Sequence, residues 1–145
     1  MKAIILAGGF GTRLRPLTTN IPKPMCPIMN TPMLEHIINL LKKHNITEIS
    51  MMLFFQPEVI TNYFRDGSAF GVKIEYITSD RDLGTAGCIM LTKEKFKGED
   101  FIIVSGDLLT NFDLTAALGF HKKNKALGTI VLTQSTDPLR YGIVV

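Results

Sequence analysis

The sequence predicts a layered α/β/α domain of the Rossmann-like type, with helices on both faces of a mostly parallel sheet. Short apolar runs recur along the chain, most of them without polar alternation, segments with helical periodicity separate them, and glycine-rich or polar turns follow several of the runs. Runs without alternation are typical of strands buried on both faces, as in parallel sheets. With 145 residues the chain has the size of one domain, so we expect a single hydrophobic core.

Five apolar runs are expected to form strands, because they are short, rich in β-branched or aromatic residues and bounded by turn residues. They cover residues 3–6, 49–55, 72–77, 101–104 and 129–132. The first run follows Lys2 but ends at Gly8, which is too early for the apolar part of a secretory signal. Because helical segments lie between the runs, we expect right-handed crossovers from strand to strand.

The clearest helical segment covers residues 33–44. Thr31 is expected to cap its amino end, and Pro32 suits its first position. Its apolar residues share one face at helical spacing, and they are Leu34, Ile37, Ile38 and Leu41.

Two further helices are predicted from the same spacing. One covers residues 57–65 and should end before Gly67, and the other should follow Asp113 as its cap. The inward-facing residues are expected to be Val59, Ile60, Tyr63 and Phe64 in the former helix and Leu114, Ala117, Leu118 and His121 in the latter.

The composition favours a cytoplasmic protein that binds small anionic molecules. The net charge is +3 at pH 7, but acidic and basic residues are interspersed, so no basic stripe indicates nucleic acid as a partner. No segment approaches the roughly 20 apolar residues that span a bilayer, so no membrane partner is expected. Cys26 and Cys88 lie far apart, without the spacing of a metal site or a disulfide scaffold, which is typical of reduced cytosolic thiols.

A glycine-rich segment after the first apolar run is the strongest functional signal. Its glycines permit positive φ angles and a close approach of the backbone, so successive N–H groups can converge on phosphate oxygens. Arg13 adds a permanently charged fork that suits phosphate, and Lys23, between two prolines, adds a point charge. The candidate nucleotide-binding residues of this segment are Leu6, Ala7, Gly8, Gly9, Gly11, Thr12 and Arg13.

This segment matches neither of two familiar phosphate-binding motifs. Thr12 and Arg13 follow Gly11, where the Walker motif requires Lys and then Ser or Thr. Leu14 stands where the dinucleotide fingerprint requires a third glycine. A tight turn with surface charges is the alternative, but it accounts for one or two glycines rather than for the whole segment.

Asp107 is the candidate metal ligand. It follows the expected strand at residues 101–104, and ligands of open parallel sheets gather beyond the carboxyl ends of the strands. Mg²⁺ binds one or two carboxylates together with phosphate oxygens, so an Asp that faces a phosphate site suits it. The alternative is that Asp107 caps a turn or a helix, although Asp113 is better placed for capping.

Residues 6–25 resemble the signature of the sugar nucleotidyltransferases, also called nucleoside-diphosphate-sugar pyrophosphorylases. The longer pattern is most similar to the mannose-1-phosphate guanylyltransferase branch, and the resemblance covers essentially the whole chain. The further pieces that carry it are Glu35-His36-Ile37-Ile38, Phe70-Gly71-Val72, Leu83-Gly84-Thr85-Ala86-Gly87, Ser105-Gly106-Asp107 and Phe120-His121-Lys122.

The resemblance implies the nucleotide-diphospho-sugar transferase fold and a nucleotidyl transfer. A nucleoside triphosphate and a sugar-1-phosphate would give a nucleoside-diphosphate-sugar and pyrophosphate, with GTP and mannose-1-phosphate as the expected substrates and GDP-mannose as the product. The resemblance also implies catalytic roles for Arg13, Lys23 and Asp107, with Mg²⁺ as the cofactor on Asp107.

Two other segments gain roles from the same resemblance. Gly84 and Thr85 are expected to lie against the base and ribose, where the absence of a side chain on Gly84 leaves room for a flat ring. Gly142, next to Tyr141, is expected to approach the sugar.

Family members continue beyond the last residue of this chain with a Glu-Lys-Pro sugar contact and a second metal-binding Asp. We therefore expect residues 1–145 to be a truncated, amino-terminal nucleotide-binding part of a nucleotidyltransferase domain. A glucose-1-phosphate thymidylyl-, uridylyl-, cytidylyl- or adenylyltransferase is one alternative function, and a non-catalytic regulatory subunit of the same fold is another. Whether the protein forms a homo-oligomer is left open.

Overall fold

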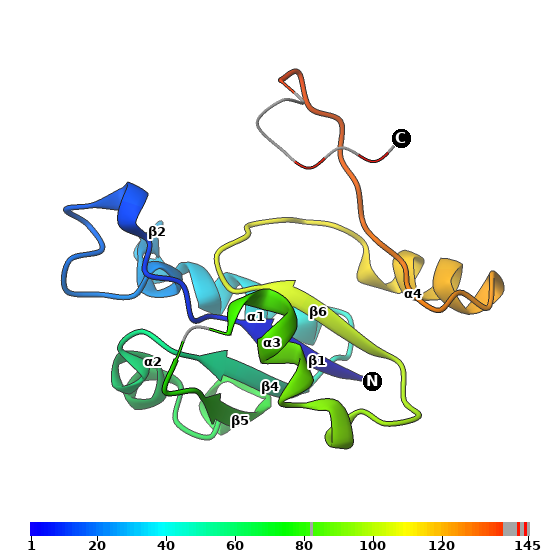
Figure 1. Cartoon of the computed structure of the whole chain (residues 1–145), viewed down its shortest axis with the longest axis horizontal. Helices are drawn as coiled ribbons and strands as arrows, with labels where there is room; N and C mark the ends of the chain where they lie inside the picture. Colours follow the sequence, from blue (N-terminus) through cyan, green and yellow to red (C-terminus); the bar gives the residue numbers. More distant parts are fainter. Residues whose placement is uncertain (82, 138–141, 143, 145) are drawn as a thin grey trace. The chain divides into compact units, whose positions relative to one another are not determined.

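The computed structural model describes residues 1–81, 83–137, 142 and 144 (Figure 1). The chain divides into two compact units, Met1–Phe112 and Asp113–Val145. No helix among the described residues is long and apolar enough to cross a membrane.

The first unit is built on a parallel sheet of four strands. β1 (Lys2–Leu6), β4 (Glu48–Leu53), β5 (Lys73–Thr78) and β6 (Phe101–Ser105) lie in the order β5-β4-β1-β6. In the centre of the sheet, Ile4 is in register with Ser50 on one side and with Ile103 on the other. A short antiparallel pair, β2 (Pro27–Ile28) and β3 (Thr31–Pro32), lies apart from this sheet. The predicted α/β class with a mostly parallel sheet is confirmed.

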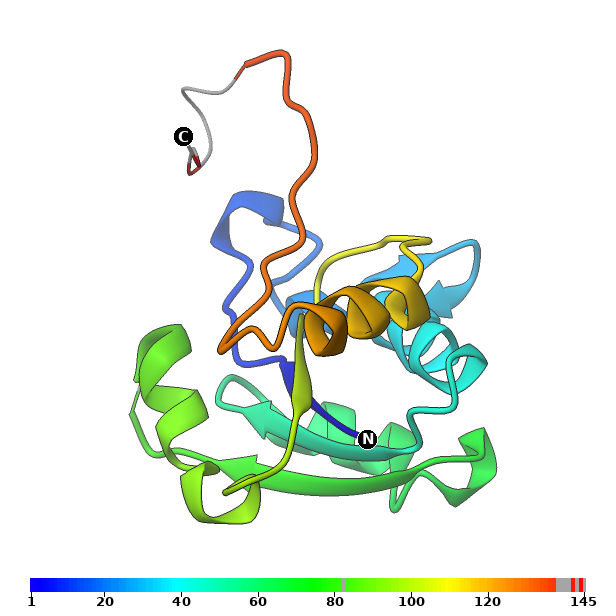
Figure 2. The same cartoon turned by 90° about the vertical axis from the view of Figure 1, so that its right-hand side faces the viewer.

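Helices cover both faces of the sheet. α1 (Met33–Lys43) and α3 (Gly84–Met90) lie on opposite faces, and α2 (Pro57–Phe64) packs near β5 (Figures 1 and 2). Single turns of 3-10 helix complete the unit, and they are η1 (Thr12–Leu14), η2 (Lys23–Met25), η3 (Ser68–Phe70) and η4 (Lys93–Lys95). The two central strands, β1 and β4, are buried from both sides, which explains why their sequences lack alternation.

The core forms where apolar faces of the helices meet the sheet. The four residues expected on the inner face of α1, Leu34, Ile37, Ile38 and Leu41, are all buried. On the sheet, Ile4 and Met52 pack with Phe96, and Cys88 of α3 lies against this cluster. Neither Cys88 nor Cys26 forms a disulfide.

The amino end of α1 differs from the prediction. Thr31 does not cap the helix, because it belongs to β3 and pairs with Ile28. Pro32 precedes the helix instead, without a side-chain cap, and the Met33 N–H donates to the Cys26 carbonyl over 3.1 Å. A backbone acceptor from the neighbouring segment thus replaces the expected side-chain cap.

α2 ends as predicted but faces the core with fewer residues than expected. Gly67 has φ +84°, and its N–H donates to the Phe64 carbonyl over 2.8 Å. Ile60 and Phe64 are buried, whereas Tyr63 is 44% exposed. Its hydroxyl donates to Glu35 of α1 over 2.8 Å, so this polar group keeps the ring at the surface.

Among its described residues, the second unit holds one helix, α4 (Leu114–Lys123), and the carboxylate of Asp113 caps it by accepting from the Ala116 N–H over 3.0 Å. The prediction of a strand at residues 129–132 is wrong. Ile130, Val131 and Leu132 are half or more exposed, and no strand among the described residues pairs with this segment. An apolar β-branched run becomes a strand only where a neighbouring strand accepts its backbone hydrogen bonds.

Candidate active site

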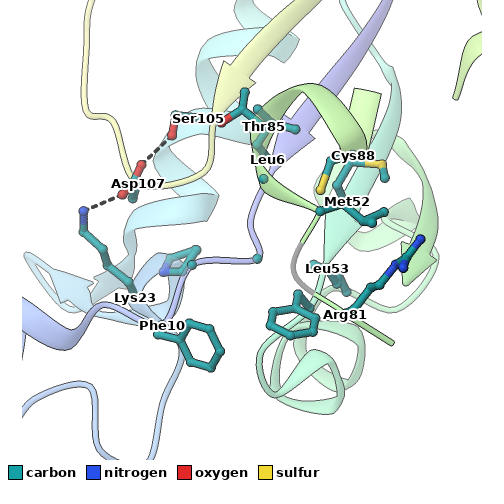
Figure 3. Close-up of a pocket in the computed structure, with 16 residues that line it drawn as sticks. Leu6, Phe10, Lys23, Met52, Leu53, Arg81, Thr85, Cys88, Ser105 and Asp107 are labelled. Atoms are coloured by element: carbon teal, nitrogen blue, oxygen red, sulfur yellow. Dashed lines mark hydrogen bonds and ion pairs between the residues drawn. The ribbon is translucent and has the colours of Figure 1, made fainter. Parts of the chain in front are cut away.

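An open cavity lies at the carboxyl ends of the parallel strands of the first unit (Figure 3). β4 and β5 lie on one side of β1 and β6 lies on the other, so the strand order reverses at β1, and ligands of open parallel sheets bind at such a point. The residues that line the cavity are Leu6, Gly8, Gly9, Phe10, Lys23, Pro24, Met52, Leu53, Phe54, Arg81, Leu83, Gly84, Thr85, Cys88, Ser105 and Asp107.

The glycine-rich loop after β1 passes close to its neighbours. A Cβ on Gly11, which has φ +64°, would lie 2.8 Å from Lys23 Cβ and 2.9 Å from Thr18 Cγ2. Thr18 is buried and donates its hydroxyl to the Gly11 carbonyl over 2.7 Å. By contrast, a Cβ on Gly9 would meet nothing within 4 Å, so its backbone is open to a ligand.

The segment after β6 is held against the end of β1. The Gly106 N–H donates to the Leu6 carbonyl over 2.7 Å, and a Cβ on Gly106 would lie 2.9 Å from that oxygen. This close approach brings Asp107 beside the glycine-rich loop. Its Oδ1 accepts a hydrogen bond of 2.6 Å from the Ser105 hydroxyl, and its Oδ2 forms an ion pair with the Lys23 ammonium.

The electrostatics of Asp107 favour its charged form. Burial works against ionisation, but the hydrogen bonds from Lys23 and Ser105 and the charge of Lys23 together hold the pKa of Asp107 below its usual value. The side chains of Asp107 and Lys23 are each 32% exposed, so both groups remain accessible from the cavity. The site therefore presents a carboxylate and an ammonium side by side.

A single carboxylate with a neighbouring hydroxyl fits a magnesium ion that takes its other ligands from phosphate and water. Two of the roughly four acceptor positions of the Asp107 carboxylate are used by Lys23 and Ser105, so the others can accept a cation. Among the described residues, no group of three or more His, Cys, Asp or Glu side chains is placed to hold a metal.

The structure brings most of the expected site residues together. Those that line the cavity are Leu6, Gly8, Gly9, Lys23, Gly84, Thr85 and Asp107. Ala7 is buried instead, and its N–H extends the sheet by donating to the Met52 carbonyl over 2.9 Å. Gly142 belongs to the second unit, and Tyr141 lies outside the described residues.

Three expected residues stand just beyond the cavity lining. Gly11 directs the loop toward Lys23, and Thr12 and Arg13 form the exposed turn η1 that follows it. The Arg13 side chain is thus at the surface next to the loop.

Several lining residues were not expected from the sequence. Phe10 lies in the middle of the glycine run and packs on Phe54 and Phe55, with ring centroids 5.4 and 5.1 Å away. Arg81 lies in the polar loop between β5 and α3. Phe10 could have been noticed as an aromatic residue among glycines, and Arg81 as a cation three residues before Gly84, the first residue predicted to contact the base.

Comparisons with known proteins agree with this geometry. A model of the nucleotidyl transferase family matches residues 2–145. A probable mannose-1-phosphate guanylyltransferase 1 of Oryza sativa is 40% identical over 149 residues, which cover 100% of this chain and 41% of that protein. A mannose-1-phosphate guanylyltransferase of Mycobacterium tuberculosis is 39% identical over 144 residues, or 99% of this chain and 40% of that one.

Solved structures show the same fold at lower identity. A putative glucose-1-phosphate thymidylyltransferase of Bacillus anthracis, in complex with sucrose, has a TM-score of 0.80 and 28% identity over 86% of this chain and 51% of its own. HddC of Yersinia pseudotuberculosis, complexed with GMP-PN, has a TM-score of 0.74 and 28% identity over 83% of this chain and 53% of its own. The chain spans about two fifths of the length of the curated relatives that it matches.

Proposed function

Because the chain belongs to the nucleotidyl transferase family, we propose that the whole protein is a sugar-1-phosphate nucleotidyltransferase that makes GDP-mannose and pyrophosphate from GTP and mannose-1-phosphate. The observation that carries the proposal is the meeting of Lys23 and Asp107. The two residues are 84 positions apart in sequence, yet they pair beside the backbone of Gly9 at the open end of the sheet. A cation, a carboxylate and exposed backbone N–H groups are the chemistry that a triphosphate requires.

The proposed reaction needs no covalent intermediate with the protein. An oxygen of the sugar phosphate attacks the α-phosphorus, a new P–O bond forms, and the bond from the α-phosphorus to the β-phosphate oxygen breaks to release pyrophosphate. Catalysis then consists of holding the reactants in line and stabilising the charge of the transition state.

The residues of the cavity have separate roles in this scheme. The backbone of Gly8 and Gly9 receives the phosphates, and Lys23 neutralises charge between the nucleotide and the sugar phosphate. Asp107, oriented by the Ser105 hydroxyl, would hold Mg²⁺, which when bound supplies Lewis acidity toward the α-phosphate. Arg13, from the exposed turn next to the loop, stabilises the leaving pyrophosphate.

The choice of GTP and mannose-1-phosphate is supported by the names of the relatives from Oryza sativa and Mycobacterium tuberculosis. A glucose-1-phosphate thymidylyltransferase is the second candidate, because the Bacillus anthracis structure carries that name. A regulatory subunit of the same fold is disfavoured, since such a role does not require a paired Lys23 and Asp107 in the cavity. We place the reaction in the cytoplasm, where Cys26 and Cys88 stay reduced.

Pyrophosphate release by the whole protein tests the proposal. The assay offers five nucleoside triphosphates, each with mannose-1-phosphate or glucose-1-phosphate, with Mg²⁺ and with a chelator in its place. We expect turnover with GTP and mannose-1-phosphate that the chelator abolishes.

Two variants test the assigned residues. Lys23→Met and Asp107→Asn should each lower kcat/KM about 100-fold or more, which is the usual cost of one lost electrostatic contact to a transition state. Lys97→Met is the matched control, because it removes the same charge from the surface outside the cavity. Near-normal turnover in both site variants, or no turnover with any substrate pair, would contradict the proposal.

A further inference from the structure

The cavity has two chemically different ends. Lys23, Asp107 and Ser105 lie together at one end, and Figure 3 shows Arg81 well away from them, on the side of Leu53 and Cys88. The walls on that side are largely apolar, and Figure 3 shows Met52, Leu53 and Cys88 there.

Arg81 has the chemistry of a recognition residue at this apolar end. Among the described residues that line the cavity, Lys23 and Arg81 are the cations, and Lys23 is paired with Asp107. The backbone of Arg81 is held by Ser79, whose hydroxyl donates to the Arg81 carbonyl over 2.7 Å and accepts from the Arg81 N–H over 3.3 Å. The turn therefore anchors Arg81 locally at this end of the cavity.

A nucleoside triphosphate would place its two halves at the two ends. Phosphates are attracted to the open backbone of Gly9 and to Lys23, at the same end as Asp107. The flat, weakly polar base then lies against the apolar walls, as bases and other aromatic ligands do in such pockets. That places the edge of the base, and not the phosphates, next to Arg81.

We infer that Arg81 selects guanine by donating two parallel hydrogen bonds to its N7 and O6. This inference rests on the proposed function, and it names the residue that sets the base specificity. The guanidinium is a planar fork of donors with no acceptor, and guanine offers two adjacent acceptors on that edge. The same pairing is the commonest specific contact of arginine with guanine in nucleic acids.

The other bases fit the fork less well. Adenine presents N7 and an amino donor, so one N–H of Arg81 would face another N–H. Uracil and thymine offer O4 without an N7, which leaves one contact in place of two. A well-made bidentate pair discriminates by about 1–3 kcal/mol, which corresponds to about 5- to 150-fold at 1.36 kcal/mol per factor of ten.

Equilibrium binding to the whole protein without sugar phosphate tests the inference. The probes are GTP, ATP, UTP and 7-deaza-GTP, in which a C–H replaces N7. We expect the protein to bind GTP at least about fivefold more tightly than 7-deaza-GTP and ATP. In Arg81→Lys the charge remains but the fork is lost, so the preference for GTP over 7-deaza-GTP should shrink toward one.

Arg81→Gln gives the sharpest result. A glutamine amide pairs with N7 and the amino group of adenine, so this variant should shift the preference from GTP toward ATP. Arg65→Gln is the matched control, because Arg65 caps α2 outside the cavity, and it should keep the ratio of the two affinities. Folding of each variant is checked by circular dichroism.

The outcomes separate this inference from the function on which it rests. Equal binding of GTP and 7-deaza-GTP, or an unchanged GTP-to-ATP ratio in Arg81→Gln, overturns the inference while the nucleotidyl transfer stands. A uniform loss of affinity for all triphosphates in Arg81→Lys would assign Arg81 to the phosphates and also overturns it. A protein that binds none of the triphosphates overturns both.

Discussion

Gly11→Ala is a substitution beside the cavity for which the structure predicts a clear cost. Gly11 has φ +64°, and the added Cβ would lie 2.8 Å from Lys23 Cβ and 2.9 Å from Thr18 Cγ2. Both contacts are well inside the roughly 3.5–4.0 Å that suits two carbon atoms. Displacing either neighbour would cost free energy, because Thr18 is buried and the backbone of Lys23 is held in a one-turn helix after Pro22.

Two terms contribute to the expected loss of stability. An alanine in the left-handed region costs about 1–2 kcal/mol, and forcing an extra methyl group into packed surroundings costs about 1–3 kcal/mol more. The free energy of unfolding should therefore fall by about 2–5 kcal/mol, which is a large part of the roughly 5–15 kcal/mol that holds a domain folded. Because the methyl group displaces Lys23, we also expect kcat to fall about 100-fold, as misplacement by about 1 Å can do.

Gly98→Ala separates the two terms. Gly98 has φ +78°, but a Cβ there would meet nothing within 4 Å, so only the backbone strain should appear. Urea denaturation of the whole protein and of both variants measures the difference in unfolding free energy. If Gly11→Ala is no more destabilising than Gly98→Ala, the tight contact among Gly11, Thr18 and Lys23 does not exist in solution.

Two smaller predictions concern regions away from the cavity. Burial and the nearby Asp66 carboxylate raise the pKa of Tyr76 to about 12, above the value of about 10 expected in the unfolded chain, so its contribution to stability is complete below pH 10 and is lost as the pH rises to 12. Phenolate absorbance should show Tyr76 titrating late, and Tyr76→Phe should remove its part of the late signal and the matching part of the alkaline loss of stability. Asp113→Ala removes the cap of α4 and should cost about 1 kcal/mol, with faster hydrogen exchange at the Ala116 amide. Unchanged exchange there would show that the cap contributes nothing to the helix.

Most of the sheet could be predicted from the sequence, because the strands are short apolar segments bounded by turn residues, and those buried on both faces lack polar residues. β1, β4, β5 and β6 follow the predicted runs to within one or two residues. The failure at residues 129–132 has the same origin, since an apolar run records a preference for burial and does not show which strand will pair with it.

The cap of α4 could be predicted from the sequence, and the start of α1 could not. The cap at Asp113 depends on an acceptor and a donor three residues apart, which the sequence shows directly. The start of α1 depends on the Cys26 carbonyl, and only the folded chain brings that group to Met33. Thr31 was predicted to cap the helix, but it pairs with Ile28 in the β2-β3 ladder instead.

The site was predictable as separate pieces rather than as an arrangement. Glycine spacing indicated a phosphate-binding loop, and the position of Asp107 after a strand indicated a ligand at the sheet edge. That Lys23 would reach Asp107 was not evident, because 84 residues separate them. Arg81 was missed because the direction of a loop side chain depends on the turn that holds it, here the one closed by Ser79.

The Lys23–Asp107 pair means that the resting site supplies its own counter-ion. A bare carboxylate at this edge of the sheet would repel an approaching triphosphate, and the ammonium of Lys23 cancels that repulsion. On the proposed mechanism, Asp107 would hold Mg²⁺ in place of the Lys23 ammonium, and Lys23 would then be free to contact the phosphates. Breaking the ion pair would free Asp107 for the metal and Lys23 for the nucleotide at once. Metal and nucleotide should therefore bind cooperatively, each weakly alone and tightly together.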